Sequence, residues 1–145
     1  MEDLKERRRL SYEGLFYSIQ RIDLLTISIS GAGTYVCLET FKYLKENPVN
    51  YPVFIKIAGA SFILAIIFNF ISQIFGRKSN EQDYLMCDTE IKAGKKITKK
   101  DKCKIEMYDK KAATYATYTD NFTLVSLILM FLGLLTLLVF FLFIF

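Results

Sequence analysis

Residues 22–38 read IDLLTISISGAGTYVCL, an apolar segment long enough to cross a bilayer as a helix. The segment carries more small and hydroxyl side chains than an exposure to lipid requires. At helical spacing most of them share one face, whose residues are Thr26, Ser30, Gly33 and Cys37, with Thr34 beside them. That face must therefore meet another span of the chain, another copy of the chain or an aqueous pore.

The composition indicates a membrane protein with several spans. Hydrophobic residues make up 52% of the chain although 23% of its residues are charged, so the two kinds must be segregated along the sequence. The chain has no histidine, the commonest general base and metal ligand, and its three cysteines show no C-x-x-C spacing. No nucleotide-binding, metalloprotease or nucleophile motif is present. We therefore expect an all-α integral membrane protein that is not an enzyme and holds no metal or cofactor.

Three apolar runs separated by polar segments predict three transmembrane helices. The N-terminal lead mixes acids with bases, and Asp23 interrupts the apolar run behind it, which favours an uncleaved segment over a signal peptide. Within the lead, Ser11 is of a type that often begins a helix, and it predicts the start of an amphipathic helix at the membrane surface. The expected order is an interfacial segment (1–21), a first span (22–44), an external turn (45–52), a second span (53–76), a cytoplasmic Lys-rich helical hairpin (77–120) and a third span (121–145).

The boundaries of the hairpin follow from capping patterns. Ser79 and Thr98 each begin a capping-box pattern, with a glutamine or an aspartate three residues later. Gly94 stands where a helix that begins at Ser79 should end. Two short helices are therefore expected here, the second of them continuing into the third span.

The second span carries its own stripe of small and polar side chains. This stripe is expected to pack against another helix, and lining a polar path is the alternative. Lys56 lies close enough to the end of the span to extend outward as an anchor. The residues assigned to helix packing are Ser61, Ala65 and Asn69.

Two basic segments are candidates for binding phosphate. One reading is that they orient the chain and touch lipid headgroups, and the other is that they bind a nucleotide or a short nucleic acid. The candidate residues are Arg7, Arg8, Arg9, Lys95, Lys96, Lys99 and Lys100. Of the 19 lysines and arginines, 16 lie in the lead and the hairpin, which predicts that the N-terminus and the hairpin are cytoplasmic and the C-terminus external.

Taken together, the RRR cluster in the lead, the Ser/Gly-rich first span, the segment KAGKKITKKDKCK and the apolar last span resemble the membrane effectors of bacterial anti-phage systems. In size and plan the chain is similar to the pore-forming effectors of the Hailong type, and the resemblance covers the whole chain as an architecture. It implies a homotetrameric channel of the inner membrane, held shut by short DNA oligomers that a partner nucleotidyltransferase makes. Opening of such a channel would depolarise the membrane.

Two classes of function remain open. In the first, the chain is an oligomeric pore lined by Thr26, Ser30, Gly33, Thr34 and Cys37, because the third span is too apolar to face water and the second keeps bulky side chains on most of its circumference. In the second, the chain is a non-conducting accessory subunit that packs its small residues against a larger membrane complex.

Overall fold

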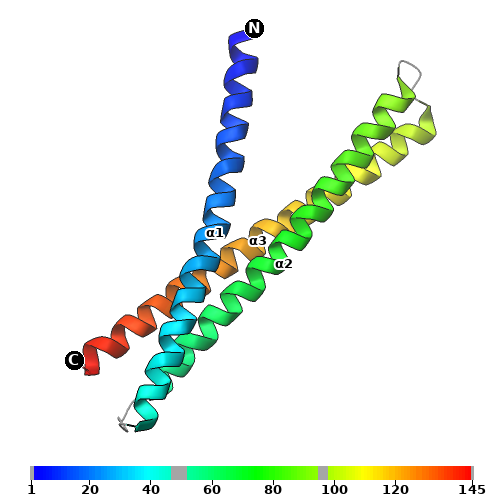
Figure 1. Ribbon diagram of the computed structural model, residues 1–145. Helices are drawn as coiled ribbons and strands as arrows, with labels where there is room; N and C mark the ends of the chain where they lie inside the picture. The colour runs from blue at the N-terminus through cyan, green and yellow to red at the C-terminus, as the bar shows by residue number, and fades with distance from the viewer. Residues whose placement is uncertain (1, 47–51, 95–97, 145) are drawn as a thin grey trace. The chain divides into compact units, whose positions relative to one another are not determined.

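The computed structural model describes residues 2–46, 52–94 and 98–144, with side chains for Tyr17 and for residues 19–45, 53–94 and 98–143. The described part of the chain folds into three helices, shown in Figure 1. Each is long enough and apolar enough to cross a membrane, which confirms the prediction of an all-α fold with three candidate spans. The predicted external turn falls largely outside the described residues. The three helices are α1 (Glu2–Glu46), α2 (Pro52–Ala93) and α3 (Lys99–Ile144).

The helices are longer than the sequence patterns predicted. The N-terminal lead and the first span form one continuous helix, so the predicted start at Ser11 is wrong. Helix α2 runs through Gly76 and through the predicted start at Ser79, where no proline interrupts it and the Ser79 hydroxyl bonds to the Ala112 carbonyl instead of capping a helix.

Three other helix boundaries have clear local causes. Pro52 opens α2, where its missing N–H costs no helical hydrogen bond. Gly94 ends this helix with a φ of 52°, and its N–H donates to the Glu90 carbonyl at 3.1 Å, as predicted for a glycine after the last turn. The predicted cap of α3 is also confirmed, since Thr98 Oγ1 lies 2.6 Å from Asp101 Oδ2 and the Asp101 N–H donates back to Thr98 Oγ1 at 3.3 Å.

The chain divides into two compact units. The first unit comprises Met1–Ile66 and Ser126–Phe145, and the second comprises Ile67–Val125. In the first unit three helical segments meet, one from each helix. In the second unit the remaining parts of α2 and α3 pack against each other.

The core of the first unit is centred on Phe62, which is fully buried. A Cβ atom built on Gly33 of α1 would lie 2.5 Å from the Phe62 ring, and one built on Gly133 of α3 would lie 2.8 Å from it. These distances are too short for real atoms, so the ring fits only because both neighbours lack a side chain. The Ser126 hydroxyl adds a hydrogen bond of 2.7 Å to the Ala65 carbonyl. The buried apolar cluster consists of Cys37, Leu44, Ile55, Ala58, Phe62 and Phe140.

The second unit is an antiparallel helical hairpin held by small residues and aromatic rings. Ser72 Oγ donates to the Thr119 carbonyl at 2.9 Å, and Ser79 Oγ donates to the Ala112 carbonyl at the same distance. The ring of Phe75 packs against three others, with centroids 5.4 to 6.1 Å apart. The packing of α2 against α3 in this unit begins within the second predicted span. The three aromatic neighbours of Phe75 are Tyr115, Tyr118 and Phe122.

We expect Gly33→Ala to destabilise the first unit, because the new methyl group would overlap the Phe62 ring. The expected decrease in the free energy of unfolding is about 1–3 kcal/mol, the usual cost of adding a group to a packed core. Thermal unfolding in detergent, followed by circular dichroism, measures the difference. A second substitution, Phe62→Leu, should restore part of the stability by removing the overlap.

Gly31→Ala is the matched control, because a Cβ atom on Gly31 would have no neighbour within 4 Å. Alanine is also the better helix former, so this variant should be at least as stable as the parent chain. Equal stability of Gly33→Ala and Gly31→Ala would contradict the described packing of Phe62.

Candidate functional site

The predicted pore-lining residues lie on the inner face of α1, inside the first unit. Thr26 is 1% exposed, Ser30 is fully buried and Thr34 is partly buried. Gly33 faces Phe62, and a Cβ atom on Gly59 would lie 3.5 Å from Cys37 Cβ. The inner face could have met another span of the chain, another copy of the chain or an aqueous pore. In the structure it contacts other spans of the same chain.

The hydroxyl groups of this face are largely occupied by the helix itself. Thr26 Oγ1 donates to the Ile22 carbonyl and Thr34 Oγ1 to the Ser30 carbonyl, each at 2.8 Å. Ser30 Oγ has no hydrogen-bond partner among the described residues. A pore along this face would require α2 and α3 to separate from α1. The assignment of the pore to this face remains a prediction, and the packing within one chain does not support it.

The residues of the second span that were assigned to helix packing are all buried. In the first unit, Ser61 is 5% exposed, and the carbonyl of Ala65 accepts the hydrogen bond from Ser126. In the second unit, Asn69 Oδ1 accepts a hydrogen bond of 3.0 Å from Gln73 Nε2. These are positions in which small or satisfied polar groups let helices approach closely.

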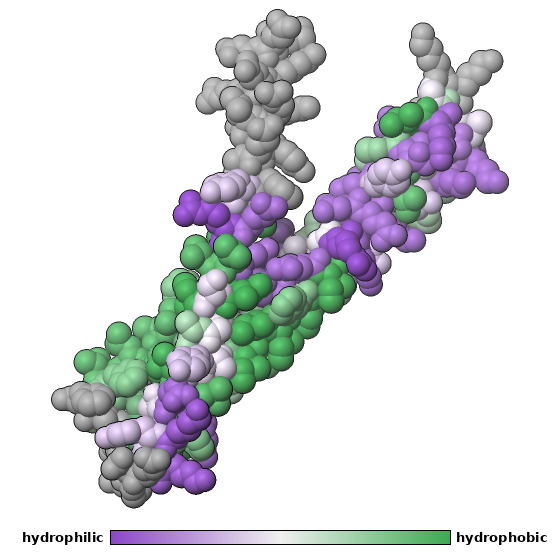
Figure 2. All heavy atoms as spheres, viewed as in Figure 1, coloured by the Kyte–Doolittle hydropathy of each residue, from purple (hydrophilic) through white to green (hydrophobic). Residues whose placement is uncertain are grey.

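The opposite, outer face of α1 carries a second stripe of small and polar residues, which the pattern of hydroxyl groups did not predict. We call it the outer strip, and its residues are Ser28, Ala32, Tyr35, Glu39 and Lys42. All five are exposed, Tyr35 at 64%. Figure 2 shows pale, weakly polar residues among the apolar ones along the middle of α1, and strongly hydrophilic residues beyond them. The spacing of four and three residues keeps these positions on one side of the helix.

Charges stand at one end of the outer strip, at Glu39 and Lys42, and beyond its other end at Arg21; the residues Ser28, Ala32 and Tyr35 between them are uncharged. The Glu39 carboxylate pairs with Lys42 Nζ at 2.6 Å, and both groups are exposed. Beyond the other end the Arg21 guanidinium lies 5.8 Å from the centroid of the Tyr17 ring. From Arg21 to Glu39 a helix rises about 27 Å, close to the roughly 30 Å thickness of the hydrocarbon core. The charged ends therefore fit the two membrane surfaces.

The basic residues at the start of α3 are exposed. Lys99 and Lys100 open the helix, whereas Lys95 and Lys96 lie outside the described residues. Hydrogen bonds from the Thr98 hydroxyl and backbone N–H lower the pKa of the Asp101 carboxyl. That carboxylate already caps the helix, so an added anion would meet the lysine side chains rather than the helix end. The other candidate phosphate ligands, whose side chains also lie outside the described residues, are Arg7, Arg8 and Arg9.

No family model, curated protein or solved structure matches this chain. The function is therefore inferred from the packing, exposure and charge of its own residues.

Proposed function

We propose that the chain assembles into a homo-oligomeric pore in the bacterial inner membrane, with the outer strip of α1 facing the central axis. The resemblance to anti-phage effectors implies four subunits and a pore that dissipates the membrane potential when it opens. This proposal moves the pore lining from the inner face of α1 to its outer face. A pore on a symmetry axis is lined by residues that are exposed on the single subunit, and the inner face is buried.

The observation that carries the proposal is the contrast between the exposed surfaces of the first unit. The exposed side chains of α3 in this unit are large and apolar, as a lipid environment favours. The exposed surface of α1 is mixed instead: Leu24, Leu25 and Leu38 are exposed, but the outer strip also presents a hydroxyl, a small residue and a phenol ahead of the charged Glu39 and Lys42. The large exposed residues of α3 are Ile128, Phe131, Leu132, Leu135, Leu138, Leu142 and Phe143.

The spacing of the outer strip suits parallel helices around an axis. Positions repeating every four and three residues stay on the same side when neighbouring helices supercoil. Ala32, which is small and exposed, would let neighbouring helices approach closely. Since the middle of the strip has no fixed charge, the pore should discriminate weakly between ions, and Tyr35 is the bulkiest group that would narrow it.

The same strip also supports a second candidate function. Small exposed residues on a transmembrane helix are typical of a packing interface, so the chain could instead be an accessory subunit that docks this face on a larger membrane complex. The two functions differ in what the purified chain does alone. A pore must be a discrete symmetric oligomer, whereas an accessory subunit purified alone would be a monomer or would aggregate.

The proposal includes orientation and regulation. The N-terminus and the hairpin face the cytoplasm, which is the side favoured by 16 of the 19 basic residues. A short DNA oligomer or a nucleotide would bind there through the basic segments and hold the pore shut. Exposed Lys99 and Lys100 supply the described part of this surface.

Ser28→Phe should block ion flux without disrupting the subunit, because Ser28 is an exposed residue of the outer strip. A bulky apolar group on the axis would narrow and dewet the path. The measurements are depolarisation of cells with a potential-sensitive dye and the mass of the purified oligomer. Leu135→Phe is the control, because Leu135 is 61% exposed on α3 and should only touch lipid. Full flux through an intact Ser28→Phe oligomer would contradict the proposed lining.

Replacing Lys99 and Lys100 together with glutamine should weaken the binding of a short single-stranded oligonucleotide. For every phosphate that is no longer neutralised, the slope of log affinity against log salt should become shallower by about 0.7. Replacing Lys110 and Lys111 in the same way is the control, because they are exposed on the same helix outside the basic segment. Equal slopes for both double variants would place the regulator elsewhere.

A further inference from the structure

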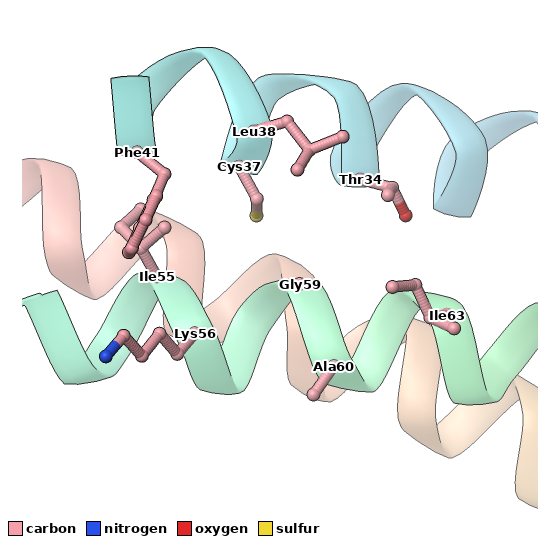
Figure 3. A pocket seen from close by; sticks show the side chains of 9 residues that line it. All are labelled: Thr34, Cys37, Leu38, Phe41, Ile55, Lys56, Gly59, Ala60 and Ile63. Atoms are coloured by element: carbon pink, nitrogen blue, oxygen red, sulfur yellow. The ribbon is translucent and has the colours of Figure 1, made fainter. Parts of the chain in front are cut away.

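A groove lies between α1 and α2 in the first unit, with a volume of about 240 Å³. Figure 3 shows the side chains of its two walls. The volume is below the roughly 300–1,000 Å³ of sites for small molecules, so the groove suits part of a long ligand. Its lining residues are Thr34, Cys37, Leu38 and Phe41 of α1, and Ile55, Lys56, Gly59, Ala60 and Ile63 of α2.

The groove exists because α2 presents small residues where α1 passes it. Gly59 and Ala60 leave the space open, and Cys37 lies beneath it at 4% exposure. Leu38 and Ile63 are about half exposed at its edges. The hydroxyl of Thr34 is already bonded to the backbone of its own helix, so the walls are effectively apolar.

One end of the groove carries a positive charge. Lys56 and Phe41 lie together at this end in Figure 3, with Thr34 and Ile63 toward the other. The ammonium of Lys56 is 5.8 Å from the centroid of the Phe41 ring. Within the described part of the chain, no ion pair to Lys56 is found. Lys56 also follows the start of α2 at Pro52 by about one turn, which places it near the end of the span.

We propose that this groove binds an anionic phospholipid, with one acyl chain along the apolar walls and the headgroup phosphate on Lys56. The walls lie between two membrane-spanning helices, where acyl chains are the surrounding solvent. The single charge at one end complements a molecule that is apolar along its length and negative at its head. With the proposed orientation, the lipid would belong to the external leaflet. The lipid would hold α1 and α2 together at a site separate from the outer strip.

The test uses the full-length chain purified in detergent and loaded with phosphatidylglycerol or phosphatidylcholine of identical acyl chains. Native mass spectrometry counts the lipid that each sample retains. The parent chain should prefer phosphatidylglycerol about fivefold, the preference that one lysine gives to an anionic headgroup. Lys56→Gln should abolish this preference, while Lys45→Gln, an exposed lysine of α1 outside the groove, should keep it. Equal decreases in the two variants would indicate general surface attraction and overturn the site.

Filling the groove tests the acyl chain separately. Ala60→Leu should reduce retention of both lipids, whereas Ala113→Leu, at an exposed alanine of the second unit, should leave retention unchanged. Unchanged retention in Ala60→Leu would show that the acyl chain lies elsewhere.

A second readout covers the case in which Ala60→Leu fails to fold. In a Cys87→Ser, Cys103→Ser chain, Cys37 beneath the groove is the remaining thiol. Phosphatidylglycerol should slow its alkylation by N-ethylmaleimide, and glycerol 3-phosphate, which has no acyl chain, should not. Unchanged alkylation with lipid bound would also overturn the site.

Discussion

The aromatic ring of Phe62 between Gly33 and Gly133 sets the packing of the three spans. Neither glycine could carry a side chain without overlapping the ring, so these two positions let α1 and α3 approach α2 around it. Once the ring is in place, the inner face of α1 is occupied along its length, from Thr26 to Leu44. The hydroxyls on this face bond to their own backbone or remain buried. The face therefore packs the single chain together, and the proposed function places contact with water on the outer strip instead.

Helix α1 consequently has two faces whose small and polar residues are not explained by contact with lipid alone. The inner face satisfies the demand for close packing within the chain. The outer strip leaves Ser28, Ala32 and Tyr35 exposed, where large apolar side chains would interact better with lipid. In the proposed oligomer this exposed face lies toward the axis. The groove proposed for lipid lies on a third side of α1, where α1 packs against α2. The proposed lipid and the proposed pore therefore do not compete for the same residues.

Much of the fold could be predicted from local sequence. Three apolar runs predicted three spans, Gly94 predicted the end of α2, and Thr98 with Asp101 predicted the cap of α3. Each of these signals acts within a few residues of the chain. The start predicted at Ser79 failed because a serine can cap a helix or bond across to another helix, and only the position of Ala112 decides between the two. The candidate site was harder to predict for a related reason. Helical periodicity identified the residues that share the inner face of α1. What that face contacts depends on Phe62 and Gly133, which lie far along the chain. The outer strip lies in the same segment of sequence, but its fewer hydroxyl groups gave a weaker signal.

The most direct test of the central claim is disulfide crosslinking between copies in native membranes. In a chain whose three natural cysteines are replaced by serine, a single cysteine is placed at Ala32 or at Ser30 and the membranes are oxidised. Covalent dimers are predicted from Ala32→Cys, because Ala32 is exposed toward the proposed axis, and none from Ser30→Cys, because Ser30 is buried within its own subunit. Dimers from Ser30→Cys with none from Ala32→Cys would return the pore to the inner face and contradict the claim.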